Sequence, residues 1–95
     1  MSEPVAIRVT LVRLKNPCNA CIIVGRLLLE SVERVKRDRP DIAFEQIELA
    51  DVREAPRIPG IEVERFPSLL LNGEQISAGS MVTPRDLNEM MERLR

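Results

Sequence analysis

The feature that most constrains the fold is a change of hydrophobic period near Pro17. Residues 5–14 (VAIRVTLVRL) are mostly β-branched and other apolar residues, which predicts a strand buried on both faces over its middle. From Asn19 to about Asp38, apolar residues recur every three or four positions, which predicts an amphipathic helix. Residues 42–49 (IAFEQIEL) predict a second strand, and this order favours two parallel strands joined by a right-handed crossover. The apolar stripe of the helix comprises Ala20, Ile23, Val24, Leu27, Leu28, Val32 and Val35.

The second half of the chain contains a strong hairpin signal. Both central positions of a type I′ turn favour positive φ, and Asn72-Gly73 supplies residues that adopt it readily. The turn therefore predicts an antiparallel pair of strands over residues 68–71 and 74–78.

Two further helices complete the expected fold. A short helix over residues 51–55 would be ended by Pro56 and the Ile58-Pro59-Gly60 turn. A last helix would begin with Thr83 as N-cap and Pro84 at the first helical position, where the missing N–H costs nothing. The resulting β-α-β-α-β-β-α order predicts an α/β fold, with a mixed four-stranded sheet flanked by helices on both faces. The buried face of the last helix is expected to comprise Leu87, Met90, Met91 and Leu94.

Composition and charge exclude several functions. The 95 residues are expected to form one domain over residues 1–95. The 14 basic and 15 acidic residues are mixed along the chain, so no basic block is available for nucleic acid or an anionic membrane. No signal peptide is visible, and no apolar stretch approaches the roughly 20 residues that cross a bilayer, which predicts a cytoplasmic protein. The chain has no His, which excludes a Cys-His or Ser-His couple and a His-ligated metal site within one chain.

The residues that carry chemistry are Cys18-Asn19-Ala20-Cys21, at the boundary between the first strand and the helix. Two cysteines three residues apart can reach each other across one helical turn. Unpaired N–H groups and the helix dipole favour a thiolate at Cys18, and such positions can lower the pKa of a cysteine from about 8.5 to roughly 3.5–7.5. Cys21, one turn further, would be shielded. This asymmetry predicts that Cys18 attacks and that Cys21 resolves the mixed disulfide.

A second motif strengthens the redox hypothesis. A C-x-x-C near a strand–helix unit is typical of thioredoxin-like proteins. Residues 60–74 (GIEVERFPSLLLNGE) resemble the thioredoxin-family segment in which a cis-proline precedes a strand and a hairpin. The chain therefore resembles small thioredoxins and glutaredoxins over nearly its whole length. The resemblance implies a thioredoxin-like fold of glutaredoxin size and activity as a thiol–disulfide oxidoreductase.

The resemblance also implies which residues meet the substrate. Pro67 is expected to be cis and to face the cysteines, and the backbone of Phe66 is expected to pair with an extended substrate segment. Pro17, directly before Cys18, is expected at the same surface. Lys15 stands where glutaredoxins hold a glutathione carboxylate, although Ala78-Gly79-Ser80-Met81 departs from the segment that holds the other end of glutathione.

The expected partners are a protein or small-molecule disulfide and an external thiol reductant, with no cofactor and with a monomeric chain. Departures from the family leave the reduction potential open, because Pro17 replaces the thioredoxin Trp and Asn19-Ala20 replaces Gly-Pro. Two alternatives remain. The thiolates could bind a soft metal, or a cluster completed by a second chain. The fold could also serve as an adaptor whose cysteines turn over little.

Overall fold

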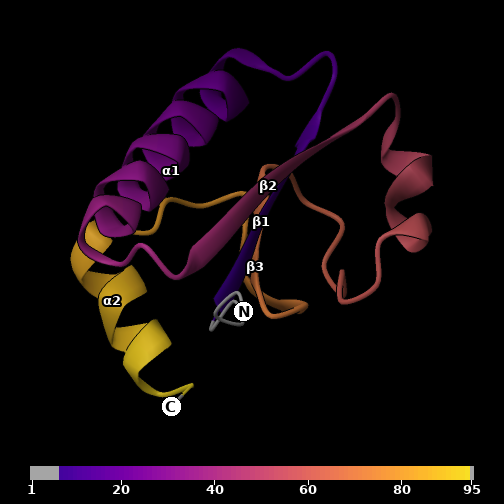
Figure 1. The fold of residues 1–95 in the computed structure, drawn as a ribbon. Coiled ribbons are helices and arrows are strands. Elements are labelled where there is room, and N and C mark those ends of the chain that lie inside the picture. Colours follow the sequence, from indigo (N-terminus) through magenta and orange to yellow (C-terminus); the bar gives the residue numbers. More distant parts are fainter. Residues whose placement is uncertain (1–6, 95) are drawn as a thin grey trace.

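A computed structural model describes residues 7–94 as a mixed four-stranded sheet with three helical segments (Figure 1). The strand order is β2-β1-β3-β4. Strands β1 and β2 are parallel, whereas β1–β3 and β3–β4 are antiparallel. The parallel crossover and the hairpin are therefore as predicted. In chain order the elements are β1 (Ile7–Leu14), α1 (Asn19–Asp38), β2 (Ile42–Leu49), the 3₁₀ helix η1 (Val52–Arg57), β3 (Ser68–Leu71), β4 (Glu74–Ala78) and α2 (Pro84–Glu92).

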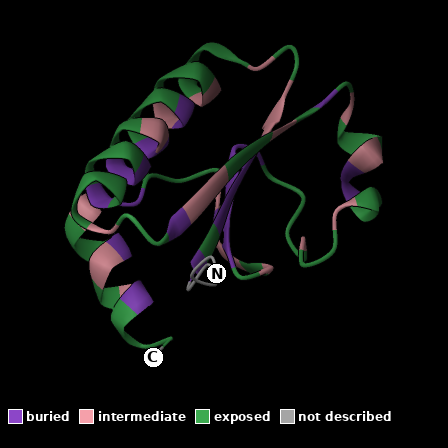
Figure 2. Cartoon of the chain, viewed as in Figure 1, coloured by how far each residue is buried: buried purple, intermediate pink, exposed green. Residues whose placement is uncertain are grey.

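Both α-helices cover the same face of the sheet (Figure 1). Their buried residues, purple in Figure 2, turn toward the strands. The main core on this face joins apolar residues of α1 and α2 to the central strands, and its fully buried members include Val9, Leu11, Leu28, Leu69 and Leu87. Burying each of these side chains contributes about 1.5–3 kcal/mol, so this layer fixes α1 on the sheet.

The opposite face of the sheet is covered by η1 and the loop after it. The sequence predicted helices on both faces, and on this second face the only helix within residues 7–94 is the short η1. The helix continues through Pro56 and ends at Arg57, directly before the Ile58-Pro59-Gly60 turn that was expected to end it together with Pro56. Asp51 caps η1, and Glu54 completes a capping box. Pro56 is tolerated because its fixed φ of about −65° suits a 3₁₀ helix, and its missing N–H costs the helix only one hydrogen bond.

The predicted stripe of α1 is wrong in part. Ile23 is 62% exposed and Leu27 is 36% exposed, while the residues buried against the sheet include Gly25 and Ser31 with Leu28. At about 100° per residue, Leu27 lies about 100° and Ile23 about 140° around the helix from Leu28. Because small residues form part of the buried face of α1, that face lies at a different angle around the helix from the apolar stripe predicted from the sequence.

The termini of the later elements follow their local signals. Asn72 and Gly73 have φ values of 51° and 83°, as the hairpin required. The hydroxyl oxygen of Thr83 accepts a hydrogen bond of 3.1 Å from the N–H of Asp86, which makes Thr83 the N-cap of α2. Leu94, expected in the buried face, lies beyond the end of α2 and is 42% exposed. Within residues 7–94, no helix is long and apolar enough to cross a membrane.

Candidate functional site

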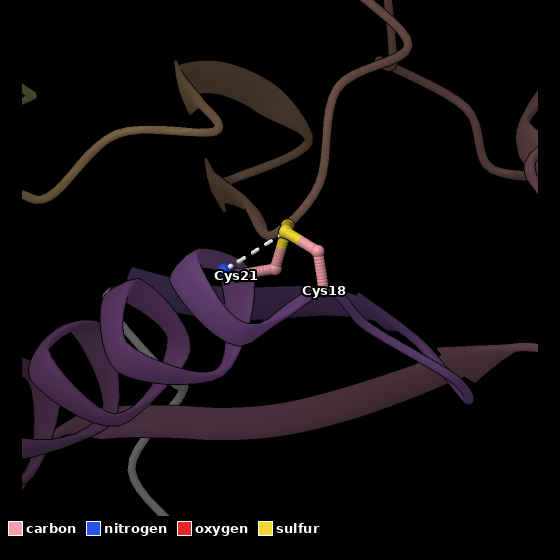
Figure 3. Close-up of a disulfide and its surroundings, with 2 residues drawn as sticks. All are labelled: Cys18 and Cys21. Atoms are coloured by element: carbon pink, nitrogen blue, oxygen red, sulfur yellow. Dashed lines mark hydrogen bonds between the residues drawn. A yellow bond between two sulfur atoms is a disulfide. The ribbon is translucent and has the colours of Figure 1, made fainter.

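The two cysteines form a disulfide at the N-terminus of α1 (Figure 3). Their Cα atoms lie 5.0 Å apart. Cys18 is the N-cap residue, and its sulfur accepts a hydrogen bond of 3.2 Å from the backbone N–H of Cys21. Cys18 is exposed and Cys21 is half-buried. Cys21 is therefore more shielded than Cys18, which is the difference in exposure that the sequence predicted.

Local structure fixes this position of the cysteines. The N–H of Lys15 donates to the carbonyl of Leu49 at 2.7 Å, which ties the connection after β1 to the end of β2. The carbonyl of Cys18 accepts the first helical hydrogen bond from Ile22 at 2.9 Å. The first turn of α1 contains no acidic residue. The partial positive charge of the helix terminus therefore acts on the Cys18 sulfur without a competing carboxylate in that turn.

The Phe66–Pro67 peptide bond is cis, as the resemblance implied. Both residues are buried, and both line the same pocket as Cys21. The carbonyl of Pro67 accepts a hydrogen bond of 2.8 Å from the N–H of Gly79. Within residues 7–94, no group forms a hydrogen bond to the N–H or the carbonyl of Phe66. These backbone groups remain available to an extended segment of another molecule.

A glutamine that the sequence did not single out holds the loop before Pro67. The side-chain oxygen of Gln75 accepts hydrogen bonds from the N–H groups of Glu62 and Val63, at 3.0 and 2.9 Å. Its amide nitrogen donates to the carbonyl of Val63 at 2.9 Å and to the hydroxyl of Ser68 at 3.0 Å. One side chain on β4 thus makes three hydrogen bonds to the loop before Pro67 and one to Ser68 directly after it. In the sequence Gln75 resembles any polar residue of a strand.

A pocket of about 330 Å³ adjoins the disulfide on the side of Cys21. Five of the six residues that the sequence assigned to the site line it, namely Cys21, Pro17, Phe66, Pro67 and Lys15. Cys18 does not line it. The remaining lining residues were not predicted, and they are Arg13, Leu14, Ile22, Gly25, Arg26, Leu29 and Glu48.

The charged groups of the pocket are three cations and one carboxylate. Arg13 and Glu48 are neighbours in the register of β1 and β2, while Lys15 follows β1 and Arg26 belongs to α1. These residues come together only where the ends of β1 and β2 meet α1 in the fold, so no spacing along the chain revealed them. No three potential metal ligands among Cys, His, Asp and Glu gather anywhere in residues 7–94, so a metal that requires more than two ligands would draw the others from another molecule.

Comparisons with known proteins inform the fold alone. No family model matches the chain, and no curated protein matches it. Among the solved structures, one described as "Structure of a malarial protein" is similar, with a TM-score of 0.61 and 16% sequence identity. The similarity covers 92% of this chain and 94% of that chain. A small α/β fold with a mixed four-stranded sheet and a Cys18–Cys21 pair fits a thioredoxin-like fold.

Proposed function

We propose that this protein is a thiol–disulfide oxidoreductase in which Cys18 attacks and Cys21 resolves. The observation that carries the proposal is the position of the exposed Cys18 sulfur at the N-terminus of α1. There it accepts the N–H of Cys21 and is bonded to the sulfur of Cys21, a half-buried residue. Backbone N–H groups at a helix terminus stabilise a thiolate, and the thiolate is the nucleophile in disulfide exchange.

The reaction proceeds in two displacements. The Cys18 thiolate attacks one sulfur of a substrate disulfide, the substrate S–S bond breaks, and the departing thiolate takes a proton from water. Cys21 then loses its proton and attacks the Cys18 sulfur. The mixed disulfide breaks, the second substrate thiolate leaves, and Cys18–Cys21 is oxidised. Two electrons pass from the dithiol to the substrate disulfide, and an external thiol reductant restores the dithiol.

The surface beside Cys18 supports an extended protein segment as the substrate. The free N–H and carbonyl of Phe66 can pair with a peptide backbone in the manner of an added strand. The bonds of Gln75 keep the preceding loop in place for this pairing. A small-molecule disulfide could react at the same exposed sulfur without using the backbone of Phe66.

The proposal is tested by equilibrating the protein in defined dithiothreitol or glutathione redox buffers, alkylating free thiols and measuring the mass. Mass is the suitable readout because the chain has no Trp or Tyr. We expect two thiols to appear together at one potential, within the span of roughly −120 to −270 mV that thiol–disulfide oxidoreductases cover. A pair that never forms the internal disulfide, or a bound metal that blocks alkylation, would contradict the proposal and favour the metal-site or adaptor alternative.

A further inference from the structure

Arg13 is a half-buried cation that has no acidic partner among residues 7–94. Its guanidinium donates a hydrogen bond of 2.7 Å to the side-chain oxygen of Gln46, a neutral amide. No carboxylate in residues 7–94 lies within ion-pair distance of it, although Glu48 is its neighbour in the strand register. A charge that is partly removed from water and bound to a neutral group remains available to stabilise a nearby anion.

The packing of Arg13 places it beneath the face of α1 that carries Cys21. Gly25 lies one helical turn after Cys21 and therefore on the same face. A Cβ atom at Gly25 would lie 3.6 Å from Cδ of Arg13 and 3.9 Å from Cγ of Pro67. Arg13 and Cys21 also line the same pocket. The stem of Arg13 thus lies against α1 one helical turn after Cys21.

The other charged groups of the pocket are more exposed. Lys15, Arg26 and Glu48 are all exposed, whereas Arg13 is half-buried. Water and salt screen exposed charges strongly, and a partly buried charge is screened less. Arg13 is therefore expected to exert the largest effect on a charge that forms at Cys21, with Lys15 and Arg26 acting in the same direction and Glu48 against them.

We propose that Arg13 is a positioning residue for the resolving step, and that its unpaired charge stabilises the thiolate of Cys21. The inference rests on the proposed oxidoreductase function. In the mixed disulfide, Cys21 releases its proton to water in the pocket and becomes a thiolate beside Arg13. The thiolate forms the bond to Cys18, and the electron pair of the broken bond leaves on the sulfur of the substrate.

The first test measures Cys21 alone. In a Cys18→Ser background, the rate of alkylation by iodoacetamide is followed against pH by mass. We expect Arg13→Gln to move the pH midpoint of the reaction upward by about one unit, which is about a tenfold loss of rate at neutral pH. Arg13→Lys is expected to restore most of the rate because it keeps the charge. Arg85→Gln is the matched control, because Arg85 is an exposed arginine on α2.

A second variant leaves Arg13 in place and neutralises it. Gln46→Glu puts a carboxylate where the guanidinium now binds an amide, so it is expected to raise the midpoint in the same direction as Arg13→Gln. This variant also keeps the test valid if Arg13→Gln fails to fold. An unchanged midpoint in Gln46→Glu, or an Arg13→Lys variant as slow as Arg13→Gln, would overturn the role of Arg13.

Measuring the two displacements separately distinguishes a failure of this inference from a failure of the proposed function. In the otherwise intact protein, Arg13→Gln is expected to slow release of the substrate from the mixed disulfide about tenfold at neutral pH. In a Cys21→Ser background, the attack by Cys18 is expected to slow less than the resolving step does, because Cys18 is exposed to water and does not line the pocket with Arg13. If Arg13→Gln turns over and its resolving step has an unchanged rate, the role of Arg13 is rejected and the proposed function stands. If the unmodified protein shows no disulfide exchange, the proposed function itself is rejected.

Discussion

The backbone N–H of Cys21 donates a hydrogen bond to the sulfur of Cys18, 3.2 Å away, at the first turn of α1 (Figure 3). The bond runs in one direction only, from Cys21 to Cys18. It adds to the dipole of α1 in favouring negative charge on Cys18. The two cysteines of this motif are therefore chemically unequal before any substrate binds.

The first prediction concerns this inequality. In the reduced protein at pH 7, Cys18 should react with iodoacetamide at least about tenfold faster than Cys21, because its sulfur is exposed and its thiolate is stabilised. Limited alkylation followed by peptide mass mapping measures the two rates in one sample. Equal labelling of the two residues would show that the helix terminus does not activate Cys18.

The second prediction compares two glycines. A Cβ at Gly60 would lie 1.9 Å from the carbonyl oxygen of Gly73, and the φ of Gly60 is +95°. Gly60→Ala should therefore lower the free energy of unfolding by more than about 2 kcal/mol.

Gly25→Ala is the matched control for that substitution. Its new Cβ meets ordinary contacts at 3.6 Å or more, and alanine favours a helix interior, so a gain of about 0.5–1 kcal/mol is expected. Urea unfolding followed by far-ultraviolet circular dichroism measures both variants. Equal effects would contradict the placement of Gly60 against the hairpin.

The third prediction concerns the glutamine that holds the loop before Pro67. Gln75→Ala removes four hydrogen bonds and should lower the free energy of unfolding by about 1–3 kcal/mol. Gln75→Glu keeps the acceptor for Glu62 and Val63 but loses the donor, so its loss should be smaller.

The same pair of variants tests the link between this loop and the reaction. If the loop presents Phe66 to a peptide, Gln75→Ala should raise KM for a protein disulfide and leave the reaction with a small-molecule disulfide nearly unchanged. Equal losses with both substrates would assign Gln75 to stability alone.

The fourth prediction concerns the start of α2. Thr83→Ala removes the acceptor for the N–H of Asp86 and should cost about 1 kcal/mol of stability. Thr83→Ser keeps the hydroxyl and should change stability by no more than about a few tenths of a kcal/mol, because serine caps helices at least as well as threonine. Thermal unfolding of the two variants under identical conditions separates these values, and equal melting temperatures would contradict the capping role.

Much of the fold could be predicted from the sequence because its signals are local. The strand at residues 42–49, the Asn72-Gly73 turn and the Thr83-Pro84 helix start each depend on a few adjacent residues, and each lies where expected. The buried face of α1 could not be predicted as well. Gly25 and Ser31 are buried, and a search for apolar residues does not identify small residues as part of a buried face.

The candidate site divides in the same way. Cys18 and Cys21 are recognised by their spacing and by the change of period before them. Arg13 and Gln75 are not, because their importance depends on which residues the strand register brings opposite them. A motif reveals the reacting groups, and the side chains that set their environment become visible only with the fold.

The most direct test of the proposed function is to trap the intermediate. Cys21→Ser is mixed with a protein disulfide, quenched with acid, and mapped by mass. We predict a mixed disulfide at Cys18 that persists, whereas the unmodified protein releases reduced substrate and Cys18→Ser forms little or no adduct. Adducts forming equally at Cys21 in Cys18→Ser, or no adduct at Cys18 in Cys21→Ser, would contradict Cys18 as the attacking thiol.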